Sequence, residues 1–238
     1  MTYIEGFVAA VPKANKATFI DHANRGDSVF MDNGASRVLE CWQEDVPAGK
    51  HTDFFGAVDA KDDEAVVFSW IEWPDKAARE TMNGRMEELM KTDDRFNPET
   101  NPMPFDGKRM IYGGFAPVVE EGEAIDNAYV QGFIVPVPAT NKAAYRKAAL
   151  AMWEIMKDYG ARRVVEAWQD DVPEGTQTDF FRSVKASPGE VVVFSFVEWP
   201  SREVCDASHE KMMQDERMKT FMEQAPDAEP PFDGKRMV

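Results

Sequence analysis

The chain has 238 residues, of which 43% are hydrophobic and 29% are charged, and these proportions are typical of an ordinary folded protein. Its formal net charge of −16 argues against binding to nucleic-acid phosphates or to anionic membrane surfaces. No apolar run is long enough to span a membrane, and the first residues lack the basic and apolar regions of a signal peptide. We therefore expect a cytoplasmic protein.

The first half of the chain alternates between strand-like and helix-like patterns. Runs rich in β-branched and aromatic residues predict strands at 3–11, 37–43, 52–58, 66–73 and 109–118. A helix is predicted between Asn15 and Gly34, where glycine can take the positive φ that ends a helix. A second helix is predicted to begin after Pro74. The strands 37–43 and 52–58 are predicted to form a hairpin, since only a turn separates them.

The second half of the chain repeats the first. Residues 40–47 return as 166–173, and residues 104–110 return as 231–237. A period of this length indicates a duplicated domain, because the units of solenoid proteins repeat every 20–50 residues. We predict a first domain at 1–119, an acidic linker at 120–127 and a second domain at 128–238. The last strand of the second copy is cut short by the end of the chain.

The order of elements predicts the fold of each copy. Two helices on one face of an antiparallel sheet give a ferredoxin-like α+β domain. Phe68 and Trp70 alternate with Ile71 and Trp73, so both faces of the sheet are apolar and both need a cover. We therefore expect the two antiparallel sheets to pack against each other as a pseudo-dimeric α+β barrel. Exposed strand edges would also allow the fused chain to form a further homodimer.

The repeated runs resemble a known family. Residues 40–54, 66–74 and 104–115, with their counterparts in the second copy, are similar to the YbaA-like bacterial family of unknown function. This family is assigned to the dimeric α+β barrel superfamily, so the resemblance implies a tandem fusion of two copies with this fold. It implies no agreed activity, because the wider superfamily includes cofactor-free monooxygenases, isomerases, haem enzymes and ligand-binding proteins.

Acidic and aromatic residues share strand faces in both copies. Glu40 alternates in step with Val38 and Trp42, so we expect Glu40 and Trp42 to point into the space between the sheets. The same pattern predicts an acid-aromatic cavity in each copy. The candidate catalytic residues are Glu40 and Glu166, and the candidate ligand-binding residues are Tyr3, Phe7, Trp42, Trp70, Glu72, Arg109, Tyr129, Phe133, Trp168, Glu198 and Arg236.

Two interpretations of these acids remain open. A carboxylate in such a cavity would have a raised pKa, which suits a general base or a cation-binding group beside aromatic faces. Alternatively, Glu40 and Glu72 form structural ion pairs with Arg37 or Arg109. The two Lys-Arg pairs, at 108–109 and 235–236, could likewise bind a carboxylate or phosphate or pair with these acids.

The comparison of the two copies argues against several other kinds of functional site. Cys41 corresponds to Ala167 and Cys205 to Arg79, and none of the three histidines is repeated. This disfavours a disulfide framework, a shared thiol nucleophile and a repeated histidine-based metal site. We therefore expect no metal and no cofactor, with a small-molecule ligand as the partner. The function predicted is a cofactor-free binding or enzymatic cavity, and the alternative is a non-catalytic interaction or stress-related module.

Overall fold

The structure of the protein is a computed structural model that describes residues 2–223 and 231–238. The chain forms two compact units. Unit 1 comprises Met1–Ala116, Gln169–Ser183 and Val238, and unit 2 comprises Pro117–Trp168 and Val184–Met237. Part of the second sequence repeat therefore belongs to unit 1, so the two units do not coincide with the two repeats.

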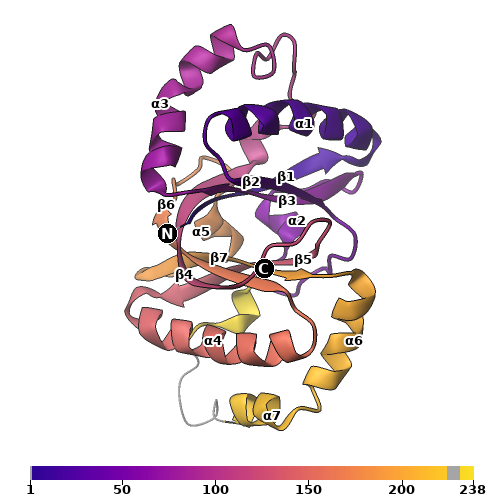
Figure 1. Cartoon of the computed structure of the whole chain (residues 1–238), viewed down its shortest axis with the longest axis vertical. Helices are drawn as coiled ribbons and strands as arrows, with labels where there is room; N and C mark the ends of the chain where they lie inside the picture. The colour runs from indigo at the N-terminus through magenta and orange to yellow at the C-terminus, as the bar shows by residue number, and fades with distance from the viewer. Residues whose placement is uncertain (1, 224–230) are drawn as a thin grey trace. The chain divides into compact units, whose positions relative to one another are not determined.

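Unit 1 contains an antiparallel sheet in the order β2-β3-β1-β4. Its strands are β1 (Tyr3–Pro12), β2 (Arg37–Trp42), β3 (Glu64–Trp73) and the first part of β4 (Ile111–Gly122). Its helices are α1 (Lys16–Asp32), the short α2 (Phe54–Ala57), α3 (Lys76–Thr92) and α5 (Phe180–Ser183), with 3-10 turns η1 (Lys13–Asn15) and η2 (Gly107–Arg109). Figure 1 shows α1 lying along one face of this sheet.

The strand register assigns side chains to the two faces of the unit 1 sheet. Tyr3 pairs with Trp73 on β3, and Phe7 pairs with Ser69. Tyr3, Ile71 and Trp73 pack with residues of α1 and α3 in one buried cluster. The face that carries Tyr3 and Phe7 is therefore the face that the long helices cover, and we call it the helix-facing side.

The opposite face of the same sheet is covered by short helices. Phe54 of α2 packs against Phe68, with ring centroids 5.7 Å apart. Phe180 of α5 packs against Phe115 of β4 at 5.1 Å. Apolar rings on this face are thus removed from water within unit 1, which contributes to its stability.

The predicted hairpin between 37–43 and 52–58 is wrong in its second strand. The residues expected in that strand form α2 instead. The side chain of Asp53 accepts a hydrogen bond from the backbone N–H of Gly56, at 2.7 Å, and so satisfies a donor at the start of the helix. Asp179 does the same for the backbone N–H of Arg182 in α5. The aspartate caps outweigh the aromatic composition that suggested a strand.

Unit 2 has strands in the order β4-β6-β7-β5, where β4 contributes its part from Pro117 onward. The other strands are β5 (Tyr129–Pro138), β6 (Arg163–Asp171), of which the part up to Trp168 belongs to unit 2, and β7 (Glu190–Trp199). The helices are α4 (Lys142–Asp158), α6 (Arg202–Met212) and α7 (Glu216–Glu223), with 3-10 turns η3 (Ala139–Asn141) and η4 (Gly234–Arg236). A buried cluster of Trp153, Val164, Val197 and Trp199 joins α4 to this sheet.

The predicted α+β fold class is confirmed. Gly34, expected at a helix end, has a positive φ of 103°, and its counterpart in the second copy, Gly160, has a φ of 108°. Glu120 and Gly122, which we expected in a linker, form the end of β4. In the described residues 231–238 no strand follows η4, as the shortened last strand predicted. The domain boundaries and the packing of one sheet on the other stay predictions, and residues 224–230 of the second repeat lie outside the described part.

No helix among residues 2–223 and 231–238 has the length and apolar character needed to cross a membrane.

Candidate functional site

Unit 1 contains a cavity of about 400 Å³ between the helix-facing side of its sheet and α1, α3 and the segment 93–110. Its walls are mainly apolar and include Phe7, Phe30 and Ile71. Met90 and Met103 line the cavity and are also exposed at the protein surface, so the cavity reaches solvent beside them. An apolar cavity with a few polar groups is the usual form of a small-molecule site.

One face of α1 forms a wall of this cavity. The residues that line it from this helix recur at helical spacing and are Phe19, His22, Ala23, Gly26, Asp27 and Phe30. Two of the six, His22 and Asp27, are polar residues within an otherwise apolar stripe. Helical geometry therefore places a carboxyl group and an imidazole directly at the cavity.

Glu40 reaches the cavity from β2. It pairs with Ser69 of β3, and the Ser69 hydroxyl donates a hydrogen bond to the Glu40 carboxyl group. Glu40 is an exposed residue that lines the cavity, and the cavity opens to solvent beside Met90 and Met103. Burial, together with repulsion from Asp27, raises the pKa of Glu40 to about 8.

Asp27 is the second carboxyl group at the cavity. Burial raises its pKa to about 7. Among the described residues it makes no hydrogen bond or ion pair, so it has no counter-charge. Asp27 and Glu40 are therefore coupled acids that take up protons near neutral pH, and like charges in one apolar site cannot both ionise easily.

The other polar side chains at the cavity have hydrogen-bond or ion-pair partners within the protein. His22 Nδ1 lies 3.1 Å from Asn101 Oδ1, and burial lowers the pKa of its imidazole. Arg95 forms ion pairs with Asp93 at 2.7 Å and with Asp32 at 2.8 Å. Its positive charge is thus engaged away from the carboxyls of the cavity.

The predicted orientation of Glu40 and Trp42 is wrong. Both lie on the helix-facing side, because Glu40 pairs with Ser69 and Trp42 with Val67. Glu72 and Trp70 lie on the opposite face, where the Trp70 indole N–H donates to Glu72 at 2.9 Å. Alternation along a strand shows which residues share a face, but it does not show which face the helices will cover.

The candidate acids of the third strand in each repeat form structural pairs. Arg37 Nη1 lies 3.3 Å from Glu72 Oε1. In the second repeat Arg163 Nη1 lies 3.2 Å from Glu198 Oε1, and Glu198 also accepts from the backbone N–H of Ile125 at 3.2 Å. Of the two interpretations of Glu72, the structural ion pair with Arg37 is the one present.

Both arginines of the Lys-Arg pairs are also engaged in ion pairs. Arg109 donates to both carboxylate oxygens of Glu64, at 2.7 and 2.6 Å. Arg236 does the same with Glu190, at 2.8 and 2.7 Å. The predicted pairing of these arginines with Glu40 or Glu72 is wrong, because each arginine pairs with the glutamate that begins a strand, Glu64 in β3 and Glu190 in β7.

Several predicted aromatic residues have structural roles. Tyr3 donates to Asp170 at 2.9 Å. Trp42 and Trp168 each lie under a lysine ammonium, at 5.0 and 5.1 Å from the ring centre. Tyr129 and Phe133 pack against the core of unit 2. Of the predicted ligand-binding residues, Phe7 and Trp70 line the cavity of unit 1, but the Trp70 ring contacts Phe68 and Glu72 on the opposite face of the sheet.

The equivalent position in unit 2 is filled. Trp153 occupies the position of Asp27, and it packs in one cluster with Val164 and Val197, the counterparts of the cavity residues Val38 and Ile71. The indole therefore takes up space that is open in unit 1.

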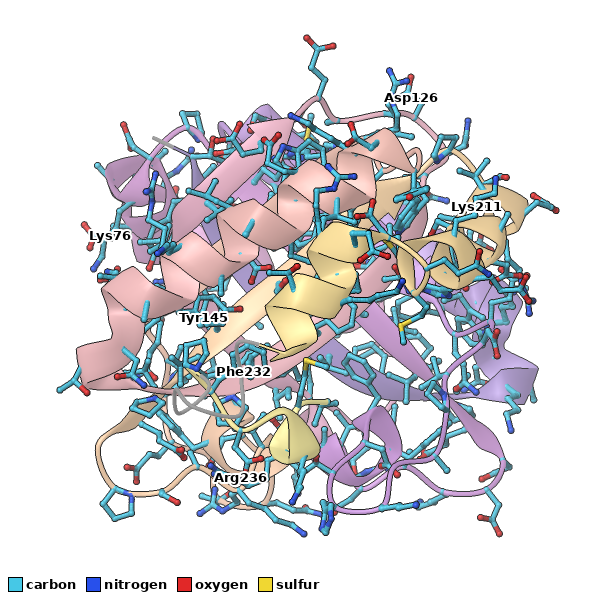
Figure 2. The ribbon with its side chains drawn as sticks, turned by 90° about the horizontal axis from the view of Figure 1, so that it is seen from below. Lys76, Asp126, Tyr145, Lys211, Phe232 and Arg236 are labelled. Carbon is cyan, nitrogen blue, oxygen red and sulfur yellow. The ribbon has the colours of Figure 1, made fainter. Side chains whose placement is uncertain are left out.

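Glu166, the counterpart of Glu40, is enclosed by this packing. The hydroxyl of Tyr145, which replaces Phe19, donates to Glu166 at 2.6 Å. Tyr145 in turn lies beside Phe232, with ring centroids 5.6 Å apart (Figure 2). Glu166 is 9% exposed, and burial raises its pKa to about 7. A cavity of about 410 Å³ does occur in unit 2, beside Trp153 and Arg162, but Glu166 is not on its wall.

Asp27 and His22 were missed because the sequence comparison kept only residues present in both copies. Asp27 corresponds to Trp153 and His22 to Ala148, so the comparison excluded both. The signal that could have found them is their place on the apolar stripe of the first helix. A site that is present in only one copy is excluded by a comparison that keeps only duplicated residues.

The raised pKa of Glu40 predicts how stability depends on pH. The folded state holds this proton up to about pH 8, whereas the unfolded chain releases it near the ordinary value of 4.5. Over this interval the folded state binds more protons, so stability falls as pH rises. We expect Glu40→Gln to become more stable relative to the wild type between pH 5 and pH 9, as measured by urea denaturation at each pH. An unchanged difference across this range would contradict the raised pKa.

Comparisons with known proteins follow the same division into repeats. The "Uncharacterized protein YbaA" of Escherichia coli K12 is 47% identical over 121 residues, which are 100% of that protein and 51% of this chain. The same protein in Shigella flexneri matches equally. One copy of the relative thus corresponds to about half of this chain.

Two solved structures share the fold over nearly the whole chain. One is a "putative monooxygenase" from Fusobacterium nucleatum, with a TM-score of 0.53, 11% identity, and coverage of 100% of this chain and 89% of that one. The other is an anthrone oxidase-like protein with a TM-score of 0.53 and 13% identity, covering 98% and 86%. The family model "Protein of unknown function (DUF1428)" matches residues 2–107 and again 128–234, and the chain therefore belongs to this family as a tandem of two copies.

Proposed function

We propose that unit 1 binds a small, flat, largely apolar molecule in the cavity between its sheet and its long helices. The observation that carries this proposal is Glu40, an acidic and exposed residue that lines an apolar cavity of about 400 Å³. A polar group turned toward apolar space is costly unless a partner joins it, and a ligand is such a partner.

The chemistry of the walls defines the ligand further. Glu40, with a pKa of about 8, is mainly protonated at neutral pH, and the apolar walls favour a neutral ligand. A protonated carboxyl donates a hydrogen bond, which a carbonyl or hydroxyl oxygen accepts. The aromatic side chains Phe7 and Phe30 offer faces for packing against a ring. We therefore assign the ligand to neutral cyclic ketones, phenols or related molecules.

The likeness to the two solved structures supports this class in a general way. Their names, monooxygenase and anthrone oxidase-like protein, refer to activities on small molecules. A fold-level likeness of this kind does not identify a substrate. The alternative of a solidly packed, non-catalytic module fits the surroundings of Glu166 in unit 2 and does not fit the open cavity of unit 1.

Binding of the neutral fluorophore N-phenyl-1-naphthylamine tests the proposal. We expect the full chain to bind it at one site and Asp27→Trp to weaken binding at least about 10-fold, because the indole fills the cavity as Trp153 does in unit 2. Tryptophan at this position is compatible with the fold, since the second repeat has it. The matched control is Ala17→Trp, at an exposed position of the same helix that does not line the cavity.

Comparison of the Asp27→Trp variant with its control distinguishes binding in the cavity from binding elsewhere. Retained binding in the control and lost binding in Asp27→Trp support a site in the cavity. Equal binding by both variants, or no binding by the wild type, would overturn it. Thermal unfolding of each variant shows whether a loss of binding reflects a loss of folding.

A further inference from the structure

Two carboxyl groups enter the cavity of unit 1 from opposite walls. Glu40 comes from the sheet, on β2, and Asp27 comes from the helical layer, on α1. Ser69 holds one oxygen of Glu40 by a hydrogen bond, while the other makes no hydrogen bond to a described residue. A flat molecule lying in this space would meet one carboxyl on each side.

We infer that unit 1 is a proton-transfer enzyme in which Glu40 and Asp27 interconvert the keto and enol forms of a bound cyclic ketone. The inference rests on the proposed small-molecule site and adds a reaction to it. Asp27 is the general base, because no described residue bonds its carboxylate. Glu40 is the general acid, because Ser69 fixes its orientation and leaves its second oxygen to face the ligand.

The reaction balances with these two groups alone. Asp27 removes a proton from the carbon next to the carbonyl group, and the C–H electron pair becomes a C=C bond. The C=O π electrons move to oxygen, and that oxygen takes the proton of the Glu40 carboxyl. The product is the enol, with Asp27 protonated and Glu40 ionised. Transfer of a proton from Asp27 to Glu40, directly or through solvent, then restores both groups, so the net change moves one hydrogen from carbon to oxygen.

The surroundings favour a state in which one of the two acids is protonated and the other is ionised. Their pKa values, about 7 for Asp27 and about 8 for Glu40, are both raised by burial, and each charge opposes the other. The other ionisable groups at the cavity are His22, whose pKa is lowered, and Arg95, which is paired with Asp93 and Asp32. Neither supplies a counter-charge that would ionise both carboxyls together.

Unit 2 provides an internal comparison, because it keeps the glutamate and lacks the aspartate. Glu166 is bonded by Tyr145 and buried, and Trp153 stands where the base would be. Unit 2 therefore has an acid without a base and without ligand space at this position. The reaction is assigned to unit 1 alone.

The test is hydrogen exchange in 2-tetralone, a bicyclic ketone with exchangeable C–H groups beside its carbonyl. Proton NMR in D₂O would follow the loss of these signals with the full chain present, after subtraction of the buffer rate. We expect Asp27→Asn and Glu40→Gln each to lower the protein-dependent rate at least about 100-fold, since general acid-base catalysis contributes this much. Glu166→Gln, the matched variant in unit 2, is expected to keep the wild-type rate.

The pH profile tests the roles of the two acids, and the fluorophore assay tests the binding site separately. The wild-type rate is expected to rise and then fall with pH, with its maximum between about 7 and about 8, because one acid must be ionised and the other protonated. No exchange above buffer, or equal rates in the wild type and both unit 1 variants, would overturn the inference. If N-phenyl-1-naphthylamine still binds in that case, the proposed binding site stands. If the fluorophore does not bind either, both proposals fail.

Discussion

Replacing Trp153 with alanine is expected to lower the free energy of unfolding of unit 2 by about 3–5 kcal/mol. Trp153 is 6% exposed and lies in the cluster that joins α4 to the sheet of unit 2. Removing the indole loses its burial and leaves a void that the packed neighbours fill only partly. Urea denaturation followed by circular dichroism would measure the change, fitted with separate transitions where the two units unfold separately.

The equivalent change in the first repeat is the matched control. Asp27→Ala alters the same helical position, but it removes a carboxyl group that is held at a cost in an apolar cavity. We expect its free energy of unfolding at pH 8 to equal or exceed that of the wild type, since ionised Asp27 has no counter-charge. Similar losses in Trp153→Ala and Asp27→Ala would show that the two repeats are packed alike, contrary to the structure.

Replacing Arg109 with alanine is expected to destabilise unit 1 by about 3–5 kcal/mol. Arg109 is 4% exposed and forms a two-point ion pair with Glu64, which is equally buried. It also donates to the backbone carbonyl of Asp59 at 2.8 Å. Removing the guanidinium leaves the Glu64 carboxylate buried without its partner, which costs more than the pair itself contributes.

Arg236→Ala is the matched control, because Arg236 has the same place in the second repeat. Its ion pair with Glu190 is more exposed, at 20% and 10% of the two side chains. We therefore expect a smaller loss, about 1–3 kcal/mol. The double change Arg109→Met with Glu64→Leu should recover part of the stability by replacing the pair with apolar groups. Equal losses in the two alanine variants would contradict the role assigned to burial.

Acid pH provides a second check on the Arg109 pair. The guanidinium lowers the pKa of Glu64 to about 2, from an ordinary value of 4.5. The stabilisation from this shift is complete above pH 4.5 and is lost as pH falls toward 2. The difference in stability between the wild type and Arg109→Ala should therefore shrink over this range. A constant difference would indicate that packing alone explains the effect.

Part of the site was predictable from local patterns. Alternation correctly placed Glu40 on one face with Trp42, and the duplicated runs correctly indicated the family and an α+β fold. The sharing of a face did not reveal that this face lies under α1, because both faces of the strands are apolar. The comparison kept only residues present in both copies and therefore excluded Asp27. The apolar stripe of the first helix nevertheless indicated the position of Asp27.

The amino-acid pattern was sufficient to predict the repeat, the helix ends and the strand residues that share a face. These features depend on interactions over a few residues, such as glycine at positive φ and side-chain alternation. Folding in three dimensions was needed to show that Asp27 and Glu40 line one cavity, that Arg109 pairs with Glu64, and that the segment Gln169–Ser183 belongs to unit 1. Each of these depends on strand register and on which apolar face the helices cover, and contacts between residues distant in sequence set both.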